Sequence, residues 1–234
     1  MIDDYQANDC MADLIEENYR LLQVISRFGM SLGFGDKTVD EVCRIYDVDT
    51  VTFLAIINFM HSGYTQVSEN LNNLSVPALI NYLRQSHVYF LDYVFPRLRK
   101  ELREVLSEDM ENPINVLITK QFDNYMAELN KHMKYEDENL FPYVEELIAG
   151  HVATNYELST FSKRHHSMDS KLRELKRILV RYSPKVVNRN ELNAVLYQIY
   201  VCEDELDAHC KAEDYIFVPV VYNLEEKIKH ANRE

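Results

Sequence analysis

Two short segments of the chain repeat the same pair of potential metal ligands. His132 and Glu136 lie four residues apart, and His209 and Glu213 repeat that spacing. Residues i and i+4 of an α-helix lie on one face, so each imidazole and its carboxylate could reach a common metal ion. In both segments a proline follows the glutamate by six residues. One His-x-x-x-Glu pair occurs often by chance, so the repetition is what makes the pattern informative.

Each repeat has a further histidine upstream. His87 precedes His132 by 45 residues, and His165 precedes His209 by 44. A helical hairpin of that length places a residue of one helix opposite its counterpart on the next. We assign His165 rather than the adjacent His166 to the interior, because the residues 3, 7, 10 and 14 positions after His165 are Met or Leu.

The predicted metal ligands are six residues: His87, His132, Glu136, His165, His209 and Glu213. Four imidazoles and two carboxylates suit a carboxylate-bridged pair of transition metals, because imidazole binds Fe, Zn, Cu and Ni and carboxylate favours harder ions. Such a centre could bind or reduce a small diatomic molecule. Burying six polar side chains without partners would cost several kcal/mol, on the order of one or more per group, and a bound metal removes that cost.

Residues outside this set are interpreted as structural. Four histidines have no counterpart in the repeat: His61, His151, His166 and His230. Five tyrosines are expected to pack in the core rather than to relay electrons: Tyr82, Tyr89, Tyr93, Tyr197 and Tyr200.

The elements that position the ligands are predicted to be helices. Glycine and proline are scarce, at 5 and 6 residues, and nearly half the chain is apolar. Long amphipathic segments cover residues 75–107, 112–150, 155–182 and 190–230. With short links between them, these segments predict an all-α fold with an antiparallel four-helix bundle. Pro96 lies inside the first segment, where it predicts a kink.

A small helical domain is predicted ahead of the bundle. We place it at residues 1–72 and the bundle at 73–234, with a polar linker near 62–75. Its expected helices cover residues 11–28, 38–46 and 50–61. Thr38 followed by Glu41 is a capping-box pattern. A DNA-binding helix-turn-helix is disfavoured, because the second short helix carries no Lys/Arg cluster.

Charge and cysteine content narrow the functional classes. A net charge of −13 argues against nonspecific nucleic-acid binding and against an anionic membrane surface. The four cysteines form no C-x-x-C pair. The sequence has no signal-peptide pattern and no apolar run of about 18 residues. These features predict a cytoplasmic, reduced protein that binds neither nucleic acid nor membrane.

The two His–Glu segments, at residues 132–142 and 209–219, resemble the hemerythrin-like HHE motifs. The set of six and its spacings, over residues 77–222, is similar to the di-iron Repair of Iron Centres proteins. Oxygen-carrying hemerythrins use a more histidine-rich set. The resemblance implies that the six residues bind two iron ions with an oxo or hydroxo bridge. It also implies repair of iron–sulfur clusters damaged by nitric oxide or oxidants, iron–sulfur proteins as partners, and a homodimer.

The N-terminal part resembles the small leading domain of the same proteins more weakly. Residues 28–39 follow its outline, and Cys43 falls where a cysteine is common. The family typically has adjacent cysteines in this turn, where this chain has Gly33 and Phe34. The resemblance therefore does not extend to the thiol chemistry of that domain.

Two functional hypotheses follow, and they leave open whether the chain is an enzyme. In the first, the chain is a non-haem di-iron protein of nitrosative or oxidative stress that donates iron or reduces nitric oxide. In the second, the same centre binds dioxygen or nitric oxide as a sensor or carrier and signals through the N-terminal domain. A structural bundle without metal is the third alternative.

Overall fold

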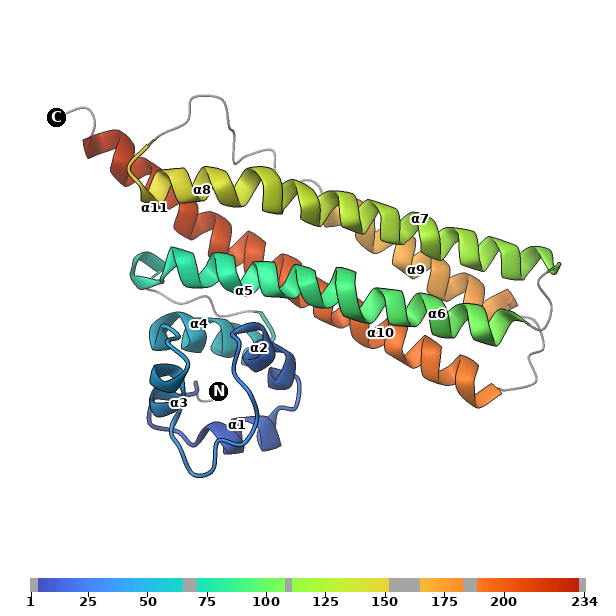
Figure 1. Cartoon of the computed structure of the whole chain (residues 1–234), viewed down its shortest axis with the longest axis horizontal. Helices are drawn as coiled ribbons and strands as arrows, with labels where there is room; N and C mark the ends of the chain where they lie inside the picture. The colour runs from blue at the N-terminus through green and yellow to red at the C-terminus, as the bar shows by residue number, and fades with distance from the viewer. Residues whose placement is uncertain (1–3, 65–70, 108–110, 152–164, 183–188, 232–234) are drawn as a thin grey trace. The chain divides into compact units, whose positions relative to one another are not determined.

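The computed structural model describes residues 4–64, 71–107, 111–151, 165–182 and 189–231, without the side chains of residues 165–170. These residues form helices and an isolated antiparallel β-bridge between Cys10 and Thr38, with no strand among them (Figure 1). The predicted all-α class, a helical bundle with a helical N-terminal part, is confirmed. None of the described helices combines the length and apolarity needed to cross a membrane.

The chain divides into two compact units. The first comprises Met1–Ser86, Phe141–Leu158 and Ala208–Glu234, and the second comprises His87–Leu140 and Ser159–Asp207. The domain boundary predicted between residues 72 and 73 stays a prediction. Most of the predicted linker, residues 65–70, lies outside the described residues.

The second unit contains the long helices, which Figure 1 shows running alongside one another. They are α6 (Phe95–Leu106), α7 (Pro113–Tyr135), α9 (His165–Tyr182) and most of α10 (Arg189–Ala212). Asn112 caps the start of α7, because its side-chain oxygen accepts a hydrogen bond from the Ile114 amide at 2.9 Å. The predicted start of the third long helix, at residue 155, lies outside the described residues.

Ion pairs connect neighbouring helices of this unit. Arg99 on α6 donates to Asp123 on α7 at 2.6 Å. Two lysines of α9 extend the series, one to α7 and one to α10: Lys171 pairs with Glu128, and Lys176 pairs with Glu203. These contacts fix which helices are neighbours.

Aromatic and leucine side chains fill the interior of the second unit. Phe95 lies with its ring centroid 5.6 Å from that of Tyr125, and both side chains are buried. Leu172, Leu175 and Leu179 of the inward stripe predicted for α9 are buried, and the side chains of His165 and Met168 lie outside the described residues. Each such side chain contributes about 1.5–3 kcal/mol through burial.

The first unit combines the N-terminal helices with helical segments from later in the chain. Its helical segments are α1 (Met11–Glu17), α2 (Leu21–Arg27), α3 (Val39–Ile45), α4 (Thr50–His61), η1 (Leu71–Asn73), most of α5 (Val76–Val88), α8 (Phe141–Ile148) and α11 (Val218–Ala231). Phe28 joins the two parts, because its ring stacks on Tyr82 of α5 at 4.9 Å and meets Phe53 of α4 edge-on at 5.3 Å.

Two sequence-based expectations about local structure were wrong. The single helix predicted over residues 11–28 is split into α1 and α2, because the Asn18 side chain accepts a hydrogen bond from the Arg20 amide at 3.2 Å and competes with the helical pattern. Three tyrosines expected in the core are exposed, namely Tyr93 (58%), Tyr197 (62%) and Tyr200 (45%), whereas Tyr82 is buried. The capping box of Thr38 and Glu41 is confirmed.

Wider π-helical turns interrupt the long helices at three places among the described residues. They are η2 (Tyr89–Val94), η4 (Glu136–Leu140) and η6 (Glu213–Phe217). Each ends two residues before a proline: Pro96, Pro142 and Pro219. Proline lacks an N–H and crowds the carbonyl four residues earlier, and the i→i+5 pattern of a π turn relieves that conflict. The disturbance predicted at Pro96 is thus a π turn, and it recurs at both His–Glu repeats.

The Thr52 hydroxyl ties α4 to the start of α5. It donates to Asp49 at 2.5 Å, accepts from the Ser75 amide at 2.8 Å, and is fully buried. We predict that Thr52→Val lowers the free energy of unfolding by about 1–3 kcal/mol, because it leaves the partly buried Ser75 amide without its acceptor. Thr52→Ser keeps the hydroxyl and should lose about 1 kcal/mol, from the missing methyl alone. Urea denaturation measures both, and equal stability of the Val variant and wild type would contradict this role.

Candidate metal centre

Three of the predicted ligands meet in the second unit. His87 lies in the last turn of α5, His132 in the last turn of α7, and Glu136 begins η4 directly after α7. Their side chains are almost inaccessible to solvent, with 2%, 7% and 0% of each exposed. Two neighbouring helices thus supply an imidazole each, and the π turn supplies a carboxylate between them.

The two oxygens of Glu136 contact different histidines. Its Oε2 lies 3.1 Å from Nε2 of His87, and its Oε1 lies 2.8 Å from Nε2 of His132. A carboxylate that bridges two ions binds one ion through each oxygen, and each ion has its own further ligands. Glu136 has this arrangement toward its two imidazoles.

The second His–Glu repeat has the same local geometry in the first unit. His209 lies in the last turn of α10, and Glu213 begins η6 immediately after that helix. Nε2 of His209 is 3.3 Å from Oε1 of Glu213, and the side chains are 1% and 0% exposed. The relation predicted from the repeated i, i+4 spacing is therefore present at both places.

Five of the predicted ligands are buried in the described residues. His87, His132 and Glu136 lie in the second unit, and His209 and Glu213 lie in the first. His165 is the first residue of α9, and its side chain lies outside the described residues. The assignment of all six as ligands stays a prediction.

The chemistry of this donor set fits a transition-metal cation. Metal–nitrogen and metal–oxygen bonds are about 2.0–2.2 Å long, so two ligand atoms on one ion are separated by about 2.9 Å at a right angle and about 3.4 Å at a tetrahedral angle. The nitrogen–oxygen distances of 2.8, 3.1 and 3.3 Å are close to that range. Two fully buried carboxylates are costly unless a cation compensates them.

The π turns explain how ligands and core residues share the same stretch of helix. One extra residue in a turn shifts the phase of the following residues by about 100°. Glu136 at the start of η4 and the consecutive Leu140 and Phe141 are therefore all buried. Glu213, Ile216 and Phe217 repeat this pattern. Without the extra residue, a regular helix would turn part of each set toward solvent.

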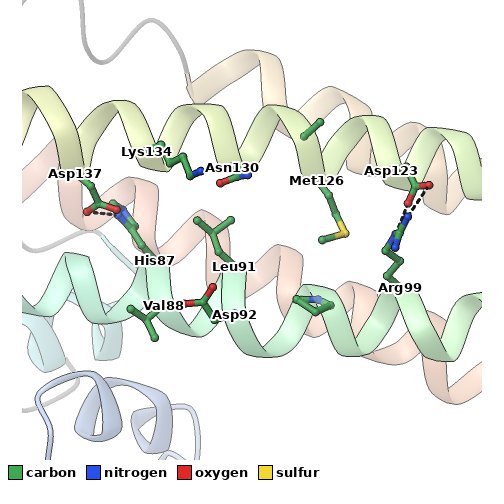
Figure 2. A pocket seen from close by; sticks show the side chains of 12 residues that line it. His87, Val88, Leu91, Asp92, Arg99, Asp123, Met126, Asn130, Lys134 and Asp137 are labelled. Atoms are coloured by element: carbon green, nitrogen blue, oxygen red, sulfur yellow. Dashed lines mark hydrogen bonds and ion pairs between the residues drawn. The ribbon is translucent and has the colours of Figure 1, made fainter.

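Asp137 is a residue that the sequence reasoning missed. Its Oδ1 lies 3.0 Å from Nδ1 of His87 (Figure 2). Glu136 contacts the other ring nitrogen, Nε2. The sequence does not single out Asp137, because it lies in a short polar run and is followed by two further polar residues. Its pairing with His87, 50 residues away, exists only in the folded chain.

A groove of about 780 Å³ runs along the second unit from this contact. His87 and Asp137 line one end and the Arg99–Asp123 ion pair lines the other, with Met126 between them (Figure 2). The Asp137 side chain at the wall of this groove is 35% exposed, whereas the side chain of His87 is 2% exposed.

Cys43 in the N-terminal part is a buried thiol. Burial raises the pKa of Cys43 to about 11, so this thiol stays protonated at neutral pH and is a poor nucleophile. Gly33 has a φ of +105°, a left-handed conformation that a cysteine rarely adopts. The turn therefore suits glycine at this position.

Fold and site together define a helical protein with a buried histidine–carboxylate cluster suited to a metal cation. The family model for the hemerythrin HHE cation-binding domain matches residues 78–221, and the chain belongs to that family. No curated protein sequence matches the chain. The matched range includes all six predicted ligands and excludes α1 to α4.

Metal binding should stabilise the folded chain. At a free metal concentration of about 100 times the Kd, a ligand that binds only the native state raises the free energy of unfolding by about 2.7 kcal/mol. We predict this gain for wild type loaded with a divalent transition metal after treatment with a chelator. The Glu136→Ala, Glu213→Ala double variant should lose it, and the exposed neighbour variant Glu138→Ala should keep it. Thermal unfolding with and without metal measures the difference, and an unchanged gain in the double variant would exclude this cluster.

Proposed function

We propose that the chain is a non-haem di-iron protein, with His87, His132, Glu136, His165, His209 and Glu213 as its ligands. The observation that carries the proposal is the contact of the two Glu136 oxygens with two different imidazoles. That geometry supports one ion at each oxygen, and we assign the equivalent glutamate of the second repeat as the second bridge. The family match supports a cation at this place.

Buried apolar side chains on the π turns favour a centre that is closed to solvent. Phe90, Leu140 and Ile216, which lie on the three π turns, are fully buried. Apolar side chains exclude water and strengthen the interaction between the carboxylates and a cation. When bound, a pair of iron ions supplies redox chemistry and an exchangeable position for a small diatomic molecule. The chain contributes the imidazoles that hold the ions and the carboxylates that balance their charge.

We assign this centre to the response to nitrosative or oxidative stress. The basis is the similarity of the six-residue set to the Repair of Iron Centres proteins, whose role is repair of damaged iron–sulfur clusters. The chain would donate iron to such clusters or reduce nitric oxide. The proposed setting is the cytoplasm, on the acidic composition of the chain. Iron–sulfur proteins and a second copy of the chain are the proposed partners.

Metal analysis of protein purified without oxygen tests the proposal. We expect about two iron ions per chain and absorption bands of a bridged iron pair. The Glu136→Ala, Glu213→Ala double variant should lose those bands, because it removes both bridging carboxylates. Less than about one iron per chain, with no other metal in its place, would refute the di-iron assignment. Surviving bands in the double variant would refute the bridging role alone.

A sensor or carrier of dioxygen or nitric oxide is the second candidate, and one contact in the first unit favours it. Phe59 of α4 lies with its ring 6.1 Å from that of Tyr215, which is on η6 two residues after Glu213. Tyr64 meets Phe59 edge-on at 5.4 Å, and Lys211 lies 4.4 Å above the Tyr64 ring. A change at Glu213 could therefore reach α4 through directly packed rings.

The two candidates differ in their reaction with nitric oxide. An enzyme supplied with excess reductant should consume nitric oxide over many turnovers, and a sensor should form a stable one-to-one adduct. For the sensor we also predict altered amide hydrogen exchange in α4 on adduct formation. Tyr215→Ala should abolish that response, and Tyr222→Ala, at a similarly exposed tyrosine of α11, should not. Turnover without any change in α4 would rule out signalling by this route.

A further inference from the structure

The contact with Asp137 gives His87 a carboxylate partner in addition to Glu136. His87 uses both ring nitrogens, with Nε2 at 3.1 Å from Glu136 and Nδ1 at 3.0 Å from Asp137. His132 contacts the other oxygen of Glu136. Asp137 therefore touches the ligand set on the Oε2 side of the bridging carboxylate.

The tautomer of the imidazole decides which atom donates the hydrogen bond in this contact. A neutral ring whose Nε2 lone pair holds a metal carries its proton on Nδ1. Asp137 is the acceptor placed for that N–H, and a carboxylate there fixes the tautomer, orients the ring and makes Nε2 a stronger donor. The ring itself is 2% exposed, so water has little access to replace that acceptor.

We propose that Asp137 is a positioning residue that sets the affinity of one of the two metal positions, the one held by His87. This inference rests on the proposed di-iron function. Asp137 does not enter the cluster of buried ligands, since its side chain lies at the wall of the groove and is 35% exposed. It acts through His87, so its loss should weaken the binding of the ion held by His87. The ion held by His132 should stay bound.

The partial exposure of Asp137 makes it open to substitution. Asp137→Ala removes the acceptor without emptying a packed core, and Asp137→Asn keeps a neutral acceptor oxygen in nearly the same place. Glu138→Ala is the matched control, because Glu138 is the exposed acidic residue next along the same π turn. The three variants separate loss of the hydrogen bond from loss of a charge near the centre.

The experiment is an anaerobic titration of the full-length, metal-free chain with ferrous iron against a competing chelator. Wild type and Glu138→Ala should bind two ions with unchanged affinity. In Asp137→Ala one of the two affinities should fall about 10–100-fold, the range for loss of an outer carboxylate partner of a metal-bound histidine. The affinity of Asp137→Asn for that ion should lie between those of wild type and Asp137→Ala. The absorption spectrum should show one perturbed iron in Asp137→Ala.

Other outcomes overturn the inference. Unchanged affinity for both ions in Asp137→Ala would show that the contact does not position His87. An equal loss at both positions, together with reduced stability of the metal-free variant, would show a purely structural role. If wild type binds no metal while its fold is intact, the proposed di-iron function fails first, and the Asp137 variants are then uninformative about any other role and the inference falls with it.

Discussion

The burial of two carboxylates is the constraint on which this structure depends. Glu136 and Glu213 are fully inaccessible to solvent inside a helical core, each beside an imidazole. A buried carboxylate destabilises a fold unless hydrogen bonds or a cation compensate it. The repeated His–Glu pairs, the π turns and the apolar side chains around them all act to assemble the donors that make such a cation favourable.

The π turns link the backbone to this chemistry. Each glutamate opens a π turn that ends two residues before a proline, and a third turn of the same kind follows His87. The proline makes a regular helix unfavourable at that place, and the wider turn allows ligands before it and core residues after it to be buried together. A feature that would weaken an ordinary helix is here compatible with a buried site. The position of proline relative to the ligand is therefore part of the site.

The parts of the chain outside the family match are not isolated from the site. The match covers residues 78–221, so α1 to α4 lie outside it. Even so, α2 and α4 pack against α5 and η6 within the first unit, through Phe28 on Tyr82 and Phe59 on Tyr215. The N-terminal helices are thereby in contact with the turn that carries Glu213. Their turn at Gly33 has a left-handed backbone, which favours glycine at that position.

The sequence alone determined the helical class and the candidate ligands, because helical periodicity and the i, i+4 spacing are local properties that a duplicated pattern makes visible. It also predicted the inward stripe of α9 and the capping box at Thr38 from local rules. The tertiary structure decided what local rules cannot encode. It broke the helix predicted over residues 11–28 at Asn18, turned Tyr93 and Tyr200 outward, and placed Asp137 against His87. Those outcomes depend on which distant residues meet, and contacts between residues 50 positions apart arise only when the chain folds.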